Sequence, residues 1–229
     1  ARDSSRNWWS ITSSSDGSKL AAVVDGGQIY TSTDSGVTWT ARATSQSWYS
    51  ITASADGTKL AAVVRNGQIY TSTDSGVNWT ARESAREWYA IASSADGNKL
   101  AAGARNGRLY TSTDSGVTWT ARESVRTWWS ITSSADGSKL AATVDNGQIY
   151  TSTDSGVTWT ARESSRGWRA ITSSSDGSRL AAVAYFNQIY TSTNGGVSWT
   201  PRENSRAWYG IASSSDGLKL AAVVFSGQI

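Results

Sequence analysis

Short apolar runs separated by glycine-containing turns fill the chain, and the pattern returns every 40 residues. β-branched and aromatic residues fill these runs, which is typical of strands. In the second unit they predict four strands, over Trp48–Ser54, Lys59–Val64, Gln68–Thr73 and Val77–Ala81. Asp56-Gly57 and Asn66-Gly67 tolerate positive φ and predict two-residue hairpins. No stretch sustains a period of about 3.6 residues, so an all-β chain is expected.

The repeat divides the chain into six units, over residues 1–40, 41–80, 81–120, 121–160, 161–200 and the partial 201–229. The second strand of each unit is apolar on both faces, as Leu60–Val64 illustrates, so each sheet is expected to be covered on both sides. Four-stranded sheets stacked face to face at a repeat of about 40–50 residues describe a β-propeller. We therefore predict a single all-β domain over residues 1–229, a β-propeller of four-stranded antiparallel blades. An open array of the same units is the alternative.

The sixth unit holds 29 of the expected residues and lacks the segment that corresponds to 30–40. Its sheet would keep an unpaired edge, which is costly in a folded protein. The chain also begins at Ala1, without an initiating Met or a signal-like segment, so a processed or partial product is expected. We predict six blades with the last one incomplete, to be completed by further residues of the same polypeptide or by another subunit; a seventh blade is the alternative.

The amino-acid composition excludes several kinds of chemistry. The chain has no Cys, Met or His, which excludes disulfides, thiolate nucleophiles and imidazole ligands, and we expect no cofactor and no metal. The net charge of +3 is too small and too dispersed for a nucleic-acid binder. No apolar run reaches about 18 residues, so no membrane insertion is expected. Thirteen Trp, by contrast, require a repeated structural or binding role.

The third and fourth strands of each unit are joined by a motif that reads Ser-x-Asp-x-Gly-x-x-Trp. It occupies Ser32, Asp34, Gly36 and Trp39; Ser72, Asp74, Gly76 and Trp79; Ser112, Asp114, Gly116 and Trp119; Ser152, Asp154, Gly156 and Trp159; and Ser192, Asn194, Gly196 and Trp199. This motif resembles the Asp box, or bacterial neuraminidase repeat, of a β-propeller family. The resemblance implies a structural role: the Asp accepts hydrogen bonds from the loop, the Gly supplies the turn and the Trp covers the hairpin. The amide oxygen of Asn194 is expected to accept as the carboxylates do.

Positions that differ between the six units are either not constrained by the shared fold or have a function of their own. They cluster before and at the start of the first strand, and in the turn between the second and third strands. An up-and-down sheet places both clusters at one end of the blade, which we call the variable face, with the boxes at the other end. Loops on a rigid scaffold often bind ligands. The candidate ligand-binding residues are Arg6, Trp9, Tyr49, Arg86, Tyr89, Arg126, Trp129, Arg166, Arg169, Tyr185, Phe186, Arg206, Tyr209 and Phe225.

A purely structural interpretation applies to part of this set. Trp9 and its counterparts at position nine of each unit begin an inner strand, so they are candidates for packing between blades. Arg169 replaces an aromatic residue at that position, and a charge there argues for contact with water. Tyr185, Phe186 and Phe225 lie in turns where polar residues are expected, which indicates a contact surface.

Sialidases carry the same motif, so catalysis has to be considered. Such an enzyme needs unique acids, an arginine cluster and a Tyr nucleophile on the axis. The acids that do not repeat within a motif are Asp3, Asp25, Asp145 and Glu87, and the arginine motif that opens sialidase domains is not recognisable. We therefore expect no enzyme.

The sequence favours a non-catalytic, extracellular or cell-surface recognition module that binds a glycan or a protein through the variable face. The alternative is a structural repeat domain of a larger surface or filament-forming assembly. A sialidase-like glycoside hydrolase is the alternative that the residues support least.

Overall fold

The computed structural model describes residues 5–225 and 227, so Asp3 lies outside the described part. Within that part the regular elements are all strands, with no α-helix. In chain order they are β1 (Trp8–Ser13), β2 (Leu20–Ser32), β3 (Thr40–Ala53), β4 (Leu60–Gly67), β5 (Ile69–Ser72), β6 (Thr80–Ala81), β7 (Arg86–Ser93), β8 (Leu100–Ala104), β9 (Gly107–Ser112), β10 (Thr120–Arg126), β11 (Trp128–Ser133), β12 (Leu140–Gly147), β13 (Ile149–Ser152), β14 (Thr160–Ala161), β15 (Arg166–Ser173), β16 (Leu180–Ser192), β17 (Thr200–Ser213) and β18 (Leu220–Val224).

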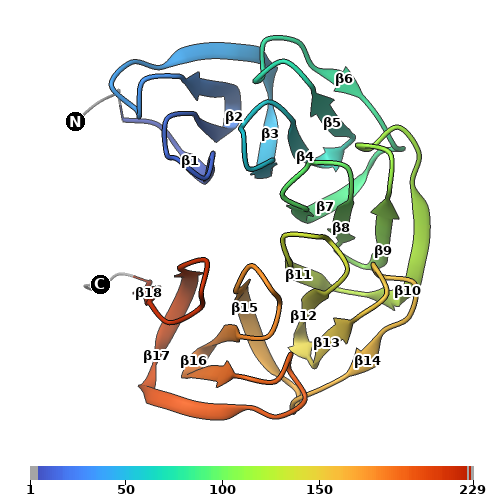
Figure 1. The fold of residues 1–229 in the computed structure, drawn as a ribbon, viewed down its shortest axis with the longest axis vertical. Helices are drawn as coiled ribbons and strands as arrows, with labels where there is room; N and C mark the ends of the chain where they lie inside the picture. The colour runs from blue at the N-terminus through green and yellow to red at the C-terminus, as the bar shows by residue number, and fades with distance from the viewer. Residues whose placement is uncertain (1–4, 226, 228–229) are drawn as a thin grey trace.

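The strands form antiparallel blades that stand side by side in an arc around a common centre (Figure 1). The long strands β2 and β16 each supply the second and third strands of one blade, and β3 and β17 each run from the fourth strand of one blade into the first strand of the next. The sixth blade consists of the end of β17 paired with β18. Because the units curve around an axis, they do not form a linear stack. Six-bladed closure, and completion of the last blade by more chain or another subunit, stay predictions.

The four predicted strands of the second unit are present, the fourth in shortened form, but the two-residue hairpins are wrong. Between the first two strands, the Ser54 N–H donates to the carbonyl of Lys59, which encloses four loop residues. Between the second and third strands, the Val64 N–H donates to the carbonyl of Gln68 and encloses three. Only one residue of each predicted dipeptide, Gly57 or Asn66, has positive φ. The Asp side chain explains the wider first turn, because it binds the serine and the N–H on either side.

The fourth strand is shorter than predicted: β6 covers Thr80–Ala81 and not Val77–Ala81. The residues before it belong to the Ser-x-Asp-x-Gly-x-x-Trp turn. Ser72 Oγ donates to Asp74 Oδ1 at 2.8 Å and accepts from the Gly76 N–H at 2.9 Å. The Trp79 indole N–H donates to the Gly76 carbonyl at 2.9 Å. The motif therefore closes on itself, and this turn replaces the start of the strand.

The fifth copy of the motif keeps two accepted hydrogen bonds with an amide oxygen and reverses a third, because Asn194 Nδ2 donates to Ser198 Oγ whereas Thr38 Oγ1 donates to Asp34 Oδ2 in the first box. Asn194 Oδ1 accepts from the Ser198 N–H at 3.0 Å and from Ser192 Oγ at 2.9 Å. The prediction that Asn194 replaces the carboxylate as an acceptor is confirmed.

Neighbouring blades are held together by an apolar interface that repeats around the arc. Trp48, wholly buried, packs with Ile51 of its own blade against Val23 and Ile29 of the preceding blade. Equivalent clusters lie between the later blades. This explains why the second strand is apolar on both faces: each of its faces belongs to a different interface.

A backbone ladder ties the blades together near the axis, at the end where the boxes lie. The N–H of Ser15 donates to the carbonyl of Ala55, and the same 2.7 Å bond recurs from each unit to the next as far as Ser215. These residues belong to the repeated Ser-x-Asp-Gly turns, so this end of the axis is occupied by shared sequence. Variation is left to the opposite end.

Acidic pH should lower the free energy of unfolding. The pKa of each box carboxyl, Asp34, Asp74, Asp114 and Asp154, is lowered from 3.8 to about 2, chiefly by hydrogen bonds from the residue four positions on. A pKa lower in the folded than in the unfolded chain stabilises the fold above about pH 4, and this stabilisation is lost as the pH falls towards 2. Urea unfolding followed by Trp fluorescence should show this decline. A variant with all four changed to Asn should show a shallower decline; an identical pH dependence would contradict the assignment.

The hydroxyl of Thr143 is wholly buried and has no hydrogen-bond partner among the described residues. The equivalent residues in the first, second and fifth units are Val23, Val63 and Val183. Thr143→Val should therefore raise the free energy of unfolding by about 1–2 kcal/mol, because it removes an unsatisfied polar group without changing the shape. Val183→Thr is the matched control and should lower it by a similar amount. If both variants and the wild type unfolded at the same urea concentration, the buried hydroxyl would not be the cause of lost stability.

Candidate functional site

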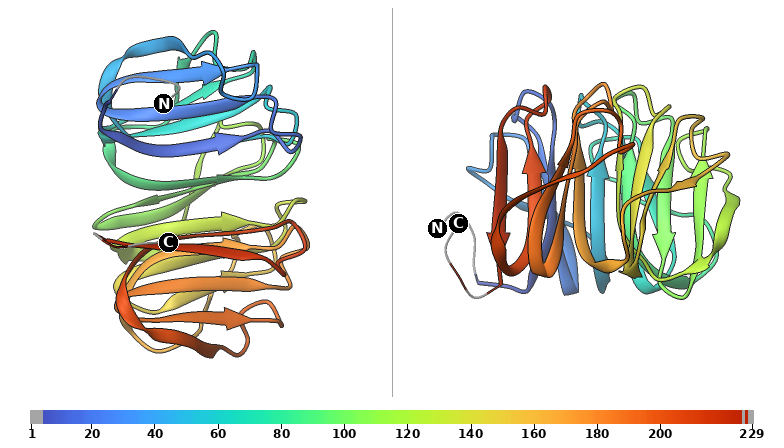
Figure 2. Two further views of the ribbon diagram at one scale, coloured as in Figure 1. Left: turned by 90° about the vertical axis from the view of Figure 1, so that its left-hand side faces the viewer. Right: turned by 90° about the horizontal axis from the view of Figure 1, so that it is seen from below.

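The two clusters of variable residues lie together at one end of the blades, as predicted. Asp25, in the turn after the second strand, pairs with Ser47 in the connection to the next blade. Asp145 pairs with Gly167 in the same way three blades further on. The strands run roughly parallel to the axis, so the turns gather at two opposite ends of the molecule (Figure 2). The variable face is therefore one continuous surface.

Position nine of each unit begins the strand nearest the axis and carries an aromatic residue or Arg. The rings of Trp9 and Tyr49 have centroids 5.0 Å apart, those of Tyr49 and Tyr89 4.4 Å, and those of Tyr89 and Trp129 5.1 Å. Each pair belongs to adjacent blades and is tilted by 43–49°. We call this group the axial cluster; it comprises Trp9, Tyr49, Tyr89, Trp129, Arg169 and Tyr209.

The residues at position nine are buried in some blades and exposed in others. Tyr89 is buried, whereas Trp9 and Tyr209 keep 44% and 41% of their surface exposed. Burial, with Tyr209 and Tyr89 nearby, raises the pKa of the Tyr49 hydroxyl well above its usual value. The hydroxyl of Tyr49 therefore stays neutral, and the cluster is a packed aromatic layer whose ends are open.

Arg169 is the position-nine residue of the fifth unit and adds a positively charged side chain to the aromatic layer. Its guanidinium lies 4.5 Å from the centre of the Trp129 ring and 2.6 Å, Nη1 to Oδ1, from Asp145. It also lies 5.5 Å from the centre of the Tyr185 ring. The planar cation therefore extends the stack that Trp129 begins, and the carboxylate of the neighbouring turn neutralises it.

The other non-repeating acids of the variable face are paired with arginines in the same way. Arg105 Nη1 lies 3.0 Å from Glu87 Oε1, and the Tyr89 hydroxyl donates to the same oxygen at 3.4 Å. Arg65 lies 3.8 Å from Asp25. Sequence reasoning left these acids out of the binding site, although their failure to repeat was the signal that could have included them.

The turn aromatics lie at the edge of this cluster. Tyr185 and Phe186 have ring centroids 4.2 Å apart, and Tyr209 and Phe225 are 6.2 Å apart. Phe186 and Phe225 are 71% and 63% exposed, and the contact surface expected of them stays a prediction.

The remaining candidates, the arginines two residues before each position-eight Trp, do not join the axial cluster. Their guanidinium groups lie 4.6–4.7 Å from the ring of the third-strand Tyr in their own blade, as in the pairs Arg6–Tyr30, Arg86–Tyr110, Arg126–Tyr150 and Arg166–Tyr190. Arg206 instead lies 5.8 Å from the Trp208 ring. Three of them also pair with a Glu three residues earlier. Their positions are those of residues that hold the connection between blades in place.

Among the described residues no group of three or more His, Cys, Asp or Glu side chains could hold a metal ion. None of the elements in this part is a helix long and apolar enough to cross a membrane.

No protein-family model and no curated protein matches this sequence. Solved structures match its fold. An ancestral GH74 enzyme has a TM-score of 0.79 and 14% identity, covering 99% of this chain and 36% of its own. The β-propeller domain of Swd1 from Myceliophteria thermophila has a TM-score of 0.73 and 17% identity, covering 96% and 81%. YCF48 bound to D1 peptide has a TM-score of 0.65 and 19% identity, covering 88% and 69%.

The chain spans about a third of the length of this GH74 enzyme and of another from Niastella koreensis. Identities this low establish the fold alone, so the chain has a β-propeller fold. The Asp-box resemblance stays a prediction that the five motifs carry.

The pair of Arg169 and Asp145 should contribute more to stability than the pair of Arg65 and Asp25. The side chains of the first pair are each 19% exposed and 2.6 Å apart, whereas those of the second are 40% and 33% exposed and 3.8 Å apart. A double-mutant cycle of Arg169→Met and Asp145→Asn should give a coupling energy of about 1–2 kcal/mol. The same cycle on Arg65 and Asp25 should give less than about 1 kcal/mol. Equal coupling in both pairs would contradict the view that the axial cluster is partly desolvated.

Proposed function

We propose that this chain is a non-catalytic recognition module that binds a segment of another protein on its variable face. The observation that carries the proposal is the pair of exposed aromatic side chains in the turns beside the axial cluster, Phe186 and Phe225. Aromatic residues and Arg are the residue types enriched where protein interfaces are most tightly bound. They stand here on turns of a scaffold that the blade interfaces hold rigid.

The backbone of Phe186 supports this interpretation. It has φ of +53°, a conformation that costs energy for a bulky side chain and that Asn66, Asn106 and Asn146 adopt at the same place in other units. Its ring is also the most exposed large apolar group on this face. A strained, exposed Phe in a turn that accepts Asn elsewhere is more readily explained by binding than by folding.

A protein partner fits this face better than a glycan does. Sugars bind to a free aromatic face beside unpaired polar groups. Here the inner rings contact one another, one face of Trp129 is covered by Arg169, and the nearby carboxylates are paired with arginines. The apolar rings of Phe186 and Phe225 lack any polar group and match apolar side chains. YCF48, which is similar in fold, was solved with a peptide bound, so the fold is compatible with such a ligand.

The same pairing supports a non-catalytic role. Asp25, Glu87 and Asp145 are each held by an arginine of a neighbouring turn or strand, whereas a glycosidase needs two carboxyl groups facing the bond it breaks. Placement outside the cell is part of the proposal and depends on the sequence resemblance alone.

The test is a screen of the 229-residue chain against a displayed library of random dodecapeptides and, in parallel, against a glycan array. Peptides with an aromatic or large aliphatic anchor should be retained, and Phe186→Ser with Phe225→Ser should weaken the best peptide about tenfold or more in fluorescence polarisation. Val117→Ser with Val157→Ser, two exposed residues of the box face, is the control and should leave binding unchanged. Retention of glycans alone, or equal loss in both variants, would overturn the proposal.

A further inference from the structure

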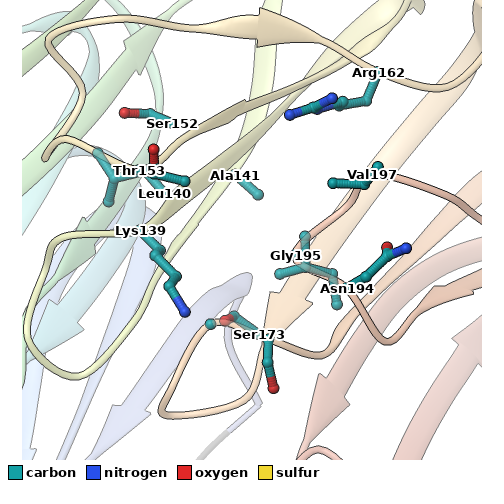
Figure 3. A pocket seen from close by; sticks show the side chains of 13 residues that line it. Lys139, Leu140, Ala141, Ser152, Thr153, Arg162, Ser173, Asn194, Gly195 and Val197 are labelled. Carbon is teal, nitrogen blue, oxygen red and sulfur yellow. The ribbon is translucent and has the colours of Figure 1, made fainter.

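A cavity of about 190 Å³ opens between the fourth and fifth blades, at the end of the molecule opposite the variable face. Figure 3 shows the side chains that surround it. Lys139 and Arg162 enter from the fourth blade, and Asn194, Gly195 and Val197 from the box of the fifth. The equivalent spaces between the first and second blades and between the second and third measure about 10 Å³ each.

The cavity exists because the fifth box differs from the other four at two adjacent positions. The others read Asp-Ser, and the fifth reads Asn194-Gly195. In the second, third and fourth boxes the serine hydroxyl accepts a hydrogen bond from a lysine of the preceding blade, as in the pair of Lys99 and Ser155 at 3.2 Å. Gly195 has no side chain to accept, and Lys139 donates instead to the backbone carbonyl of Asp176 at 2.8 Å. Removing the serine and turning the lysine aside leaves the space empty.

A comparison with the next interface supports this cause. A cavity of about 200 Å³ lies between the fifth and sixth blades, where the lining contains no box residue of the sixth blade. The box hairpin is thus the element that fills this space around the arc. Compared with the first two interfaces, the fifth box leaves the space open although its hairpin is complete, because its sequence differs.

The charged side chains that line the cavity are all positive. Lys139 and Arg162 are both in its lining, and no Asp or Glu is. Arg162 uses its Nε to hydrogen-bond Thr151 Oγ1 at 2.9 Å, and Figure 3 shows its guanidinium extending over the cavity. The change from Asp to Asn194 removes the one carboxylate that the motif would place here, while the amide keeps the turn folded. The nearby Asp176 carboxylate is bound within its own turn by Ser174 and Ser178.

We propose that this cavity, the fifth-box cavity, binds a small oxyanion, the carboxylate, sulfate or phosphate group of a ligand, because Arg162 and Lys139 are the charged residues of its lining. Both changes favour an anion: Gly195 opens the space, and Asn194 removes a carboxylate that would repel the anion. The cavity is smaller than the pockets of about 300–1,000 Å³ that hold drug-sized ligands, which limits the ligand to a free anion or one acidic sugar ring. Arg and Lys provide the charge-assisted hydrogen bonds that such groups form.

The decisive variant restores the sequence of the other four boxes, Asn194→Asp with Gly195→Ser. It should fold, because Ser35, Ser75, Ser115 and Ser155 take the same positive φ as Gly195 in otherwise equal turns. Isothermal titration calorimetry at low salt should use inorganic phosphate and D-glucuronate as probes, with D-glucose as the neutral control. The wild-type chain should bind at least one of the two anions and not glucose. The restored variant should bind one anion fewer per chain than the wild type, because the cavity between the fifth and sixth blades, lined by Arg179 and Arg202, is unchanged.

The reverse substitution tests the same cause at a different blade. Asp154→Asn with Ser155→Gly copies the fifth box into the fourth, beside Lys99 and Arg122, and should add one bound anion per chain. Binding of phosphate alone or of glucuronate alone supports the proposal and distinguishes a free anion from an acidic sugar. Absence of binding by both anions, binding of glucose with equal affinity, or unchanged binding in the restored variant would overturn it. The peptide screen of the variable face uses different residues, so the two proposals fail separately.

Discussion

Packing of the position-eight tryptophan between neighbouring blades is the interaction on which the rest of the structure depends. Trp48, Trp88, Trp128 and Trp168 are wholly buried, and each also meets the Tyr of its own third strand edge to face, with centroids 5.1–5.2 Å apart. A large aromatic side chain buries more apolar area than any other residue can at one position. Because the same interface recurs between all blades, the residues that form it must recur as well, and this requirement explains why the chain repeats.

The interface also determines where the chain is free to vary. At the box end, the backbone ladder from Ser15 to Ser215 and the Asp turns occupy the axis, so a side chain added at a turn glycine would meet its neighbour: a Cβ at Gly97 would lie 2.8 Å from Lys59. At the other end, the turns after the second strand carry no such ladder, and their central residues, such as Asn66 and Phe186, are exposed. Diversity therefore accumulates on the variable face for a steric reason, before any ligand is considered.

The sequence predicted the parts of the structure that depend on periodicity. Strand positions, the two-sided cover of the second strand and the shared end of the variable clusters all follow from a spacing that can be read directly. Turn geometry was not predictable from dipeptides, because the Ser54–Asp56 side chains widen the first turn through hydrogen bonds that depend on three residues together. The ion pairs of the variable face were missed because Arg169 and Asp145 are 24 residues apart and meet only once two blades are side by side. The fifth-box cavity is likewise a property of a lysine and a glycine from different blades.

The departures that alter chemistry are concentrated in the fifth unit: Arg169 at position nine, Tyr185-Phe186 in the variable turn and Asn194-Gly195 in the box. Each keeps the backbone of the unit. Phe186 adopts the φ that Asn takes elsewhere, Asn194 accepts the hydrogen bonds of Ser192 Oγ and the Ser198 N–H as Asp does in the other boxes, and Gly195 keeps a positive φ of +66°. A repeat architecture allows one blade to diverge while the scaffold is kept, because the similar blades beside it supply the packing energy. Similarity among the units thus identifies the scaffold, and the unit that differs most indicates where to look for binding.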